Sequence, residues 1–489
     1  MKLSVVDLLI ILAYLVSVTL WGTVIAGKQE SSRDYFLGGK QLAWWAVGLS
    51  IVASETSTLT FISVPGLAYR SNMHFLQLTL GYFIGRVLVA VVFLPAYYRG
   101  DLETAYDFIG KRFGYSMRRF TSSLFILTRV LASAVRLFAT SIPLHLITGL
   151  DYSACILLIG LFTLIYTYTG GLKAVVAMDV VQMGIYMGGA ATSMFVIVNQ
   201  LPAGWSDVAR FATAGVNKFE VLNGSWGANI AEFLTTPYTL LGGLLGGTVL
   251  TMASHGTDQL LVQRLLGCKS CRDSQKALLL DATVIVFQFA FFLVLGLCLF
   301  AFYGGVPFEQ LGLKSSDEIF PNFIVHNLPT GAVGLVIAGV LASAMGTLSS
   351  SISSLASSSY LDLFRLTGMA DRLTTKQELF WSKLFCLLWG IVLIGGAMMF
   401  RDSRDPVVEI GLKIASFSYG GLLGTFLLGL FFSRTGENEA RIGLFAGLTA
   451  MGLILWLTRI DFTWHTLIGC LVTMMVGHGM ALFGKIRLR

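Results

Sequence analysis

ASETSTLTFISVPGLAY, residues 53–69, is the stretch of sequence on which the fold depends. It ends an apolar segment, residues 44–69, that is long enough to cross a membrane. Glu55 stands here among several hydroxyl side chains, and Pro65 and Gly66 follow. We therefore predict a discontinuous helix whose unwound carbonyl groups could bind a cation. The alternative is a continuous, kinked helix in which the hydroxyl groups bond back to preceding carbonyls.

The composition of the whole chain also indicates a membrane protein. Of its 489 residues, 55% are apolar and only 12% are charged, whereas about 25% charged residues is usual in a soluble domain. So little polar surface leaves most of the exterior facing lipid rather than water. The net charge of +7 comes from basic residues spread along the chain. This distribution is typical of cytoplasmic loops and argues against nucleic-acid binding.

Thirteen apolar stretches are long enough to span a membrane, so we predict an all-α, multi-pass integral membrane protein. An odd number of spans places the termini on opposite sides. Lys and Arg are concentrated in alternate loops, which predicts an inner cell membrane protein with the N-terminus outside and the C-terminus in the cytoplasm. The predicted spans cover residues 5–26, 44–69, 74–98, 119–147, 152–171, 174–199, 235–262, 277–303, 331–361, 380–400, 406–432, 440–458 and 463–484.

The sequence favours transport over catalysis. No connection between spans is long enough for a soluble domain, and no GxxxxGK[ST] phosphate-binding loop occurs. The spans also lack the HExxH and GxSxG motifs of hydrolytic enzymes. We therefore expect a protein that is not an enzyme and draws its energy from an ion gradient. The expected partners are a small-molecule solute and the lipid bilayer, with no nucleic acid and no obligate protein partner.

A second polar stretch, ASAMGTLSSSISSLASSSYLDLF at residues 342–364, lies in the span 331–361. Its apolar residues keep roughly helical spacing, which indicates a helix with a hydroxyl-rich face rather than a flexible linker. Such a face can pack closely against another helix or donate oxygen ligands to a hard cation. The two roles are compatible.

Ionisable side chains inside other spans are candidates for pairing or binding, because charges in hydrocarbon are costly. Asp179 lies five residues into its predicted span, where it either snorkels toward the interface or completes a cation site. Arg129 and Arg136 stand two helical turns apart and share one face. With Arg86 and Lys413, they serve either as internal counter-ions of buried acids or as receptors for a substrate carboxylate.

Five motifs occur in order along the chain: DYFLGG (34–39), ASETSTLTFISVPGLAY (53–69), YTYTGGLKAVVAMDVVQ (166–182), TDQLLVQRLLGCKS (257–270) and AMGTLSSSISSLASSSYLDLF (344–364). Together they resemble the sodium:solute symporter family, which includes sodium-coupled transporters of glucose, proline and sialic acid. The resemblance runs from residue 5 to beyond residue 430. It implies the LeuT-type architecture, an inverted repeat of five plus five helices, here with one preceding and two trailing helices.

The inverted repeat implied by this resemblance divides the chain into five parts. They are a peripheral first helix and loop (1–43), the first repeat (44–200), an extracellular loop (201–234), the second repeat (235–433) and two peripheral helices (434–489).

The resemblance also implies a sodium ion as the coupling ion, bound between the broken helix and the span 331–361. The implied ligands are backbone oxygens of Ala53 and Thr56, together with Ser343, Gly346 and Thr347.

Gly346 departs from the family pattern at this site. Members usually carry two adjacent hydroxyl residues where this chain has Gly346 and Thr347, so one side-chain ligand is missing. Water, a neighbouring carbonyl, or the hydroxyl of Ser349 or Ser350 would have to substitute. Asp179 matches an acid that some members use in or near a second sodium site.

The family's solute site lies between the broken helix and the span 235–262. The corresponding residues are Glu55, Ser57 and Thr60 on one side, and Thr251, Ser254 and His255 on the other. The aromatic rings that cover a sugar in sugar-transporting members do not occur near Ser254 and His255, and the acid at position 55 resembles the proline-transporting members. The embedded cations, among them Arg136 and Lys413, point to a carboxylate on the solute.

These features predict a sodium-coupled secondary active symporter that imports a small polar organic solute by alternating access. A carboxylate-bearing solute is expected, such as an amino acid, a sugar acid or a sialic acid. The alternatives are a sodium/sugar symporter, a proton-coupled transporter and a sensor built on the transport fold.

Overall fold

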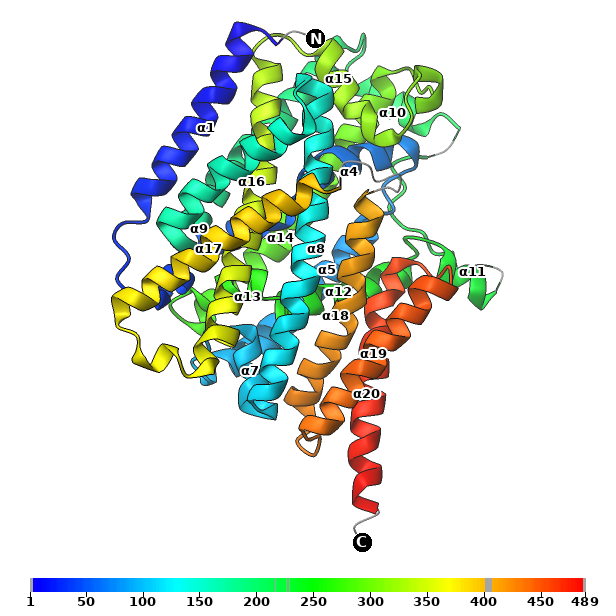
Figure 1. Cartoon of the computed structure of the whole chain (residues 1–489). Coiled ribbons are helices and arrows are strands. Elements are labelled where there is room, and N and C mark those ends of the chain that lie inside the picture. The colour runs from blue at the N-terminus through cyan, green and yellow to red at the C-terminus, as the bar shows by residue number, and fades with distance from the viewer. Residues whose placement is uncertain (1–2, 216, 226, 228, 401–406, 487–489) are drawn as a thin grey trace.

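The computed structural model describes residues 3–215, 217–225, 227, 229–400 and 407–486, and it describes side chains outside 407–416 and 483–486. These residues are arranged almost entirely in helices (Figure 1). The α-helices are α1 (Val5–Ile25), α2 (Ser32–Leu37), α3 (Trp44–Glu55), α4 (Thr58–Arg70), α5 (Leu76–Leu88), α6 (Leu94–Arg99), α7 (Ala105–Phe113), α8 (Tyr115–Thr148), α9 (Tyr152–Gln200), α10 (Trp205–Thr213), α11 (Ile230–Thr235), α12 (Gly247–Gly256), α13 (Gln259–Leu266), α14 (Cys271–Phe302), α15 (Ile319–Asn327), α16 (Ala332–Ser358), α17 (Thr375–Met398), α18 (Val407–Phe431), α19 (Glu437–Leu457) and α20 (Phe462–Ile486).

The all-helical membrane fold is confirmed, while the count of thirteen spans stays a prediction. Among the described residues, nine helices are long and apolar enough to cross a membrane, or ten if the bent pair α3–α4 forms one span. The predicted span 235–262 is carried by shorter pieces: a π-helical turn at Gly242–Gly246, then α12 and α13. Each of these helical segments is too short to span a membrane by itself.

Helix α9 joins two spans that the sequence predicts separately, 152–171 and 174–199. The backbone leaves the helical conformation at Gly171, where φ is 56° and ψ is −152°. A Cβ atom there would lie 2.4 Å from the carbonyl oxygen of Tyr35. Only glycine suits both the positive φ and this close approach. The kink at Gly171 therefore marks the boundary that the apolar pattern predicts.

The predicted break in the span 44–69 is present, so the alternative prediction of a continuous, kinked helix is wrong. Helices α3 and α4 meet at an angle of 65°. Thr56, between them, has a non-helical ψ of 89°, and Ser57 is extended. Pro65 and Gly66 lie inside α4 rather than at the break. The break thus coincides with the cluster of hydroxyl groups around Glu55.

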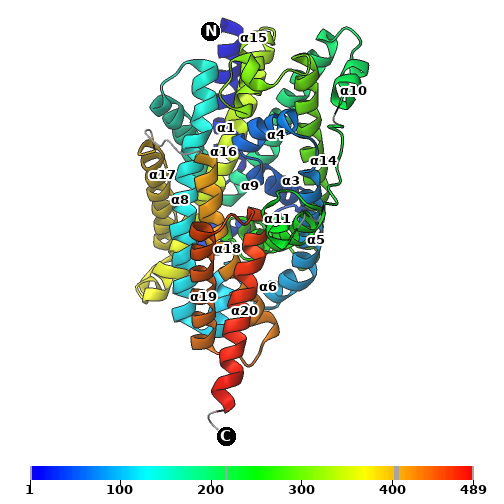
Figure 2. The ribbon, with the colours of Figure 1, turned by 90° about the vertical axis from the view of Figure 1, so that its right-hand side faces the viewer.

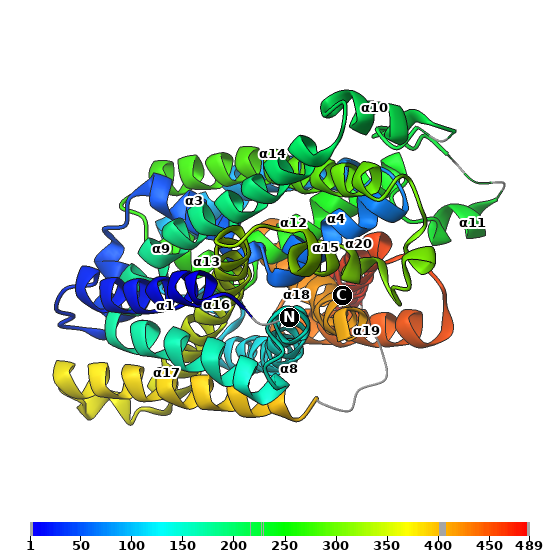
Figure 3. The same ribbon diagram turned by 90° about the horizontal axis from the view of Figure 1, so that it is seen from above.

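The hydroxyl-rich span forms α16, which occupies the centre of the molecule. In the view from above it lies among α1, α9, α17 and α8, and it packs against all four (Figure 3). Its residues are buried almost without exception from Val333 to Ser358. Small side chains allow this close packing, and most of the serines bond back to carbonyls of their own helix.

The remaining helices build two further groups around this centre. Helix α14 packs against α3, α4 and α5, while α18, α19 and α20 pack together on another side of the molecule (Figure 2). The start of α1 and the end of α20 lie at opposite ends of the molecule (Figure 1). An odd number of spans would produce this arrangement.

The outward faces of several long helices are apolar, as lipid contact requires. Helix α1 exposes Leu9 and Leu20, α17 exposes Phe380, and α19 exposes Trp456. Exposed apolar surface of this extent is unusual on a soluble monomer. These faces support a protein that is surrounded by lipid.

Candidate functional site

The site lies where the break between α3 and α4 faces α16 and the second half of α9. A Cβ atom at Gly346 would lie 3.0 Å from Oε1 of Gln182, 3.3 Å from Oδ1 of Asp179 and 3.8 Å from the carbonyl oxygen of Ala53. Three oxygen atoms from two other helices therefore converge on the space that Gly346 leaves. The structure brings Ala53 and Gly346 of the predicted sodium site together with Asp179, which the sequence analysis assigns to a possible second sodium site.

Asp179 has a buried counter-ion. Its Oδ2 accepts hydrogen bonds from Ser50 Oγ at 2.5 Å and from Arg264 Nη2 at 3.0 Å. Neither side chain of the Asp179–Arg264 pair is exposed. The snorkelling alternative for Asp179 is therefore wrong. Its second oxygen, Oδ1, is buried without a hydrogen-bond partner within the described part of the chain.

Sequence reasoning missed Arg264. It lies just beyond the predicted span 235–262, so the apolar pattern assigns it to a cytoplasmic loop. In the structure α13 carries it into the core, where its guanidinium also donates to Ser350 Oγ at 2.5 Å and to the Leu260 carbonyl at 2.8 Å. A buried arginine is tolerated here because acceptors surround it.

Gln182 is the second residue that sequence reasoning missed. Its side chain is fully buried, and both Oε1 and Nε2 lack hydrogen-bond partners among the described residues. Buried polar groups are nearly always bonded, so an amide that makes no well-formed hydrogen bond here can offer its oxygen to a ligand. One signal was available, because Gln182 follows Asp179 by three residues and shares its helix face.

The remaining predicted sodium ligands lie on the facing helices. Thr56 Oγ1 accepts a hydrogen bond from Gln288 at 2.5 Å, and Ser343 Oγ lies 3.0 Å from Thr58 Oγ1. Thr347 Oγ1 donates to the Ser343 carbonyl at 3.1 Å. The hydroxyl groups of Thr56, Ser343 and Thr347 all donate to carbonyls of their own helix, so they present lone pairs rather than protons to a ligand.

Of the two hydroxyl groups proposed to replace the missing ligand at Gly346, that of Ser350 is engaged by Arg264. Ser349 and Ser350 both donate to the Gly346 carbonyl, at 3.0 Å and 2.5 Å. Ser350 also accepts from Arg264. Gln182 and Asp179 have oxygen atoms beside Gly346 that accept no hydrogen bond from the described residues, so these atoms are better placed to supply the missing ligand.

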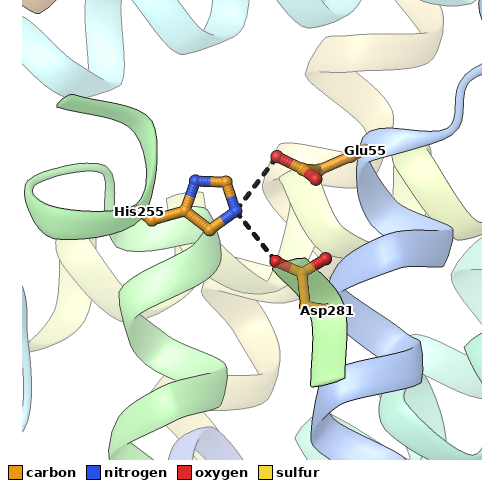
Figure 4. A group of neighbouring side chains, drawn as sticks. All are labelled: Glu55, His255 and Asp281. Atoms are coloured by element: carbon orange, nitrogen blue, oxygen red, sulfur yellow. Dashed lines mark ion pairs between the residues drawn. The ribbon is translucent and has the colours of Figure 1, made fainter. Parts of the chain in front are cut away.

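The two sides of the predicted solute site meet in a charged cluster (Figure 4). His255 Nε2, at the end of α12, lies 3.1 Å from Oε1 of Glu55 and 3.4 Å from Oδ2 of Asp281. Arg86 on α5 forms ion pairs with both carboxylates. Glu55 and His255 therefore meet as predicted, whereas Asp281 was not foreseen because it lies in the span 277–303 without a neighbouring polar motif.

The hydroxyl residues of the predicted solute site make no ion pairs, and they differ in burial. Ser57 and Thr251 are buried, and Thr60 is half-buried on the first turn of α4. Ser254 Oγ lies 2.9 Å from Nδ1 of His255 and donates to the Thr251 carbonyl at 3.3 Å. The second side of the predicted site is thus joined to the charged cluster.

The two arginines of α8 differ in their surroundings. Arg129 pairs with Asp258, whose carboxylate also accepts from Tyr419 at 2.8 Å. The Arg136 carbonyl, two turns further on, accepts from Thr140 Oγ1 at 2.9 Å, while the Arg136 guanidinium makes no hydrogen bond or ion pair with the residues that the structure describes. It lines two small cavities, one beside Thr347 and Ser351 on α16 and the other beside Asp258.

The two roles that the sequence analysis offers for the embedded cations, counter-ion or carboxylate receptor, therefore apply to different residues. Arg86 and Arg129 are internal counter-ions, and Arg136 is free to meet a ligand. The side chain of Lys413 lies outside the described residues.

Comparison with known proteins identifies the family. A model of the sodium:solute symporter family matches residues 35–447. The chain belongs to the sodium:solute symporter family, as the five motifs predict. It is accordingly a sodium-coupled transporter and not an enzyme, with sodium as its coupling ion.

Several relatives match most of the chain. The sodium/sialic acid symporter NanT of Aliivibrio fischeri is 26% identical over 95% of this chain and 91% of its own length. The sodium/sialic acid symporter SiaT of Proteus mirabilis is 25% identical, covering 96% and 93%. The human sodium/iodide cotransporter is 29% identical over 89% of this chain and 66% of the relative.

Solved structures support the same fold. A substrate-bound, outward-open structure of a sodium-coupled sialic acid symporter aligns with a TM-score of 0.87 at 25% identity, covering 98% of both chains. A transporter of the nucleobase-cation-symport-1 family aligns with a TM-score of 0.54 at 13% identity over 93% of this chain and 95% of its own, and it supports the fold alone.

Proposed function

We propose that this protein imports a small organic acid together with sodium, and that Arg136 binds the carboxylate of the solute. One observation carries the proposal: Arg136 is the described arginine of α8 that has no internal partner, and it lines both cavities. A guanidinium presents paired donors that match a carboxylate, so an unpaired one in a membrane interior suits an anionic ligand.

The names of the relatives are consistent with an anionic solute. Sialic acid, iodide and monocarboxylates are the solutes named for several of them, and each is an anion at neutral pH. A neutral sugar would leave Arg136 without a counter-charge. The sodium/sugar alternative is therefore not favoured.

We propose that sodium binds in the space beside Gly346. Its ligands there would be the carbonyl oxygen of Ala53, Oδ1 of Asp179 and Oε1 of Gln182, with the predicted oxygens of Thr56, Ser343 and Thr347 completing the set. Carboxylate, amide and carbonyl oxygens are suitable ligands for a hard cation. Gln182 thereby supplies the ligand that Gly346 lacks.

This placement gives a physical basis for coupling. A sodium ion with these ligands would hold the end of α3 against both α9 and α16. Sodium and solute can be coupled only if each binds one conformation of the protein better than the other. Bound sodium would favour the conformation in which the break between α3 and α4 lies close to α16. The solute cavity beside Arg136 is next to the sodium site, because Thr347 belongs to both.

Uptake into proteoliposomes tests the proposal. We expect N-acetylneuraminate or another carboxylate in a panel of amino acids, sugar acids and hexoses to accumulate when an inward sodium gradient is imposed, and to leave when the gradient is reversed. Accumulation of neutral hexoses alone would contradict the proposed carboxylate.

We further propose that the protein lies in the inner membrane with its N-terminus outside. Cysteine introduced at Asn229 should then react with an impermeant maleimide added to whole cells, whereas cysteine at Arg434 should react only after lysis. Both positions are exposed loop residues. The reverse pattern would contradict the orientation.

A further inference from the structure

The cluster around His255 draws one charged side chain from each of four helices. Glu55 comes from the end of α3, Arg86 from α5, His255 from α12 and Asp281 from α14. In the predicted repeats, Glu55 and His255 belong to the first helix of each half, and Arg86 and Asp281 to the second. The cluster therefore joins corresponding helices of the two halves in one contact.

The charges of this cluster do not balance unless a proton is bound. Two carboxylates face one guanidinium, which leaves one negative charge if His255 is neutral. Arg86, His255 and Asp281 are at most 1% exposed, while 23% of the Glu55 side chain is exposed. An unbalanced charge at a buried place in a membrane protein is expensive, and one proton on His255 would remove the imbalance.

The surroundings of both ring nitrogens suit the doubly protonated form of His255. Nε2 lies within ion-pair distance of two carboxylate oxygens, without the geometry of a hydrogen bond, and an ionised carboxylate can accept but not donate. Nδ1 lies 2.9 Å from the Ser254 hydroxyl, and that hydroxyl directs its own proton toward the Thr251 carbonyl. Its oxygen is then an acceptor for an N–H at Nδ1. An imidazolium satisfies both contacts, whereas a neutral ring satisfies one of them.

A metal ion fits the same atoms less well. The three side chains Glu55, His255 and Asp281 have ligand atoms within 4.8 Å of one another, as a metal site requires. The guanidinium of Arg86, however, already holds both carboxylates and would repel a second cation placed between them. A proton needs no coordination shell and leaves the Arg86 contacts in place.

Most other titratable and charged groups near His255 whose side chains the structure describes are uncharged or paired elsewhere. Arg136, which has no internal partner, is the group proposed above to bind the solute carboxylate. From α5, Tyr82 lies under the Arg86 guanidinium, 5.7 Å from ring centre to Cζ, and is uncharged when protonated. Helix α18 packs against α12, but its Tyr419 is engaged with Asp258 and Arg129. Arg264, on the neighbouring α13, is paired with Asp179.

We propose that His255 binds a proton in this conformation, so that the transporter carries a proton site in addition to its sodium site. With the proton bound, the wall beside the predicted solute residues has no net negative charge and does not repel an anionic solute. His255 itself is neither a proposed sodium ligand nor the residue proposed to bind the solute carboxylate, although its partner Glu55 lies between Ala53 and Thr56 in the sequence.

Nitrogen-15 NMR of the full-length protein in detergent tests this directly. The two ring nitrogens of an imidazolium have similar shifts, whereas a neutral ring shows one bare nitrogen with a widely different shift. The signal of His255 is assigned by its loss in His255→Gln. At about pH 7.5, where a free imidazole is mostly neutral, we expect two protonated nitrogens at His255. A bare nitrogen in the wild-type protein at this pH would overturn the proposal.

The Asp281→Asn variant tests the charge argument. Removing one carboxylate balances the cluster without a proton, so His255 should show a bare nitrogen at the same pH. If the variant keeps the imidazolium pattern, charge balance is not what holds the proton and the proposal is overturned. Glu55→Gln removes the other carboxylate charge beside His255, and it replaces Asp281→Asn as the test if that variant fails to fold. Size-exclusion chromatography and thermal melting monitor the fold of each variant.

Discussion

At the scale of single residues, the sodium site depends on an amide and a carboxylate that converge beside a glycine. Gln182→Leu keeps the volume of the side chain but removes the oxygen beside Gly346. We expect sodium affinity to fall by about tenfold or more, the range typical of lost metal-site groups. Sodium binding to purified protein, followed by calorimetry, measures this without transport.

A second substitution separates the role of this oxygen from a packing defect. Gly346→Ser in the Gln182→Ala background adds a hydroxyl where the amide has been removed, and sodium affinity should partly recover. Ser193→Ala, on the same helix and equally buried, is the matched control and should bind sodium normally. If the Gln182 variants also bind sodium normally, Gln182 is not a ligand.

Asp179 has two roles, because one oxygen faces Gly346 and the other holds Arg264. Asp179→Asn should therefore weaken sodium binding and also lower the melting temperature, since removing one member of a buried ion pair costs about 3–5 kcal/mol. The double variant Asp179→Asn with Arg264→Gln removes both charges, so its melting temperature should recover while its sodium affinity stays low. Recovery of both would show that Asp179 is purely structural.

Arg136 and Arg129 should respond differently to the same change. Arg136→Gln should lower affinity for the transported acid by about 10-fold to 100-fold, because hydrogen bonds to charged groups contribute about 1.5–3 kcal/mol. Sodium binding should persist. Arg129→Gln leaves Asp258 without its cation and should instead lower the melting temperature. Equal solute affinity in wild type and Arg136→Gln would contradict the carboxylate role.

Residues with strong local signals could be predicted from the sequence, and their partners could not. Glu55 and Asp179 stand out because they are acids within apolar spans, and Gly346 stands out because it departs from the pattern of the family that the chain resembles. Arg264 and Asp281 are brought in from other helices, and nothing in their immediate sequence shows that they are paired. The pairing of buried charges is a property of packing, so it becomes visible only when the helices are placed side by side.

At the scale of helices, α4 packs closely against α14. A Cβ atom at Gly296 would lie 2.2 Å from the carbonyl oxygen of Pro65. Gly296→Ala should push α4 away from α14 and destabilise the protein by about 1–3 kcal/mol, as overpacking commonly does. Gly188→Ala, where no atom lies within 4 Å of the added carbon, is the control and should melt like wild type.

The limits of the apolar pattern are also clear at this scale. The pattern locates the break near Glu55, but the Pro65–Gly66 pair that first suggests it lies within α4. It separates the two spans of α9, and Gly171 provides the physical reason. It places one long span at residues 235–262, where the structure has a π-helical turn and two short helices, because apolar content does not report backbone geometry.

At the scale of the whole molecule, buried charges are arranged in compact sets. Arg118 binds Asp107 and Asp362, Arg129 binds Asp258, and Arg264 binds Asp179. Each set connects segments that are far apart in sequence. Composition and motifs predict the family and the membrane fold, but the division into repeats and the thirteen spans remain predictions.

The Asp179–Arg264 pair has a consequence for how the transporter responds to voltage. Because these two charges cancel, the empty sodium site contributes no charge of its own to a conformational change. Over a complete cycle the net charge moved is that of the cargo, because the empty transporter returns to its starting state. One sodium ion with a monovalent acid, the proton on His255 staying bound throughout, would move no net charge, and uptake would not respond to a potassium diffusion potential set with valinomycin. A second sodium ion would add one elementary charge, worth about 2.3 kcal/mol per 100 mV, and an inside-negative potential would then accelerate uptake.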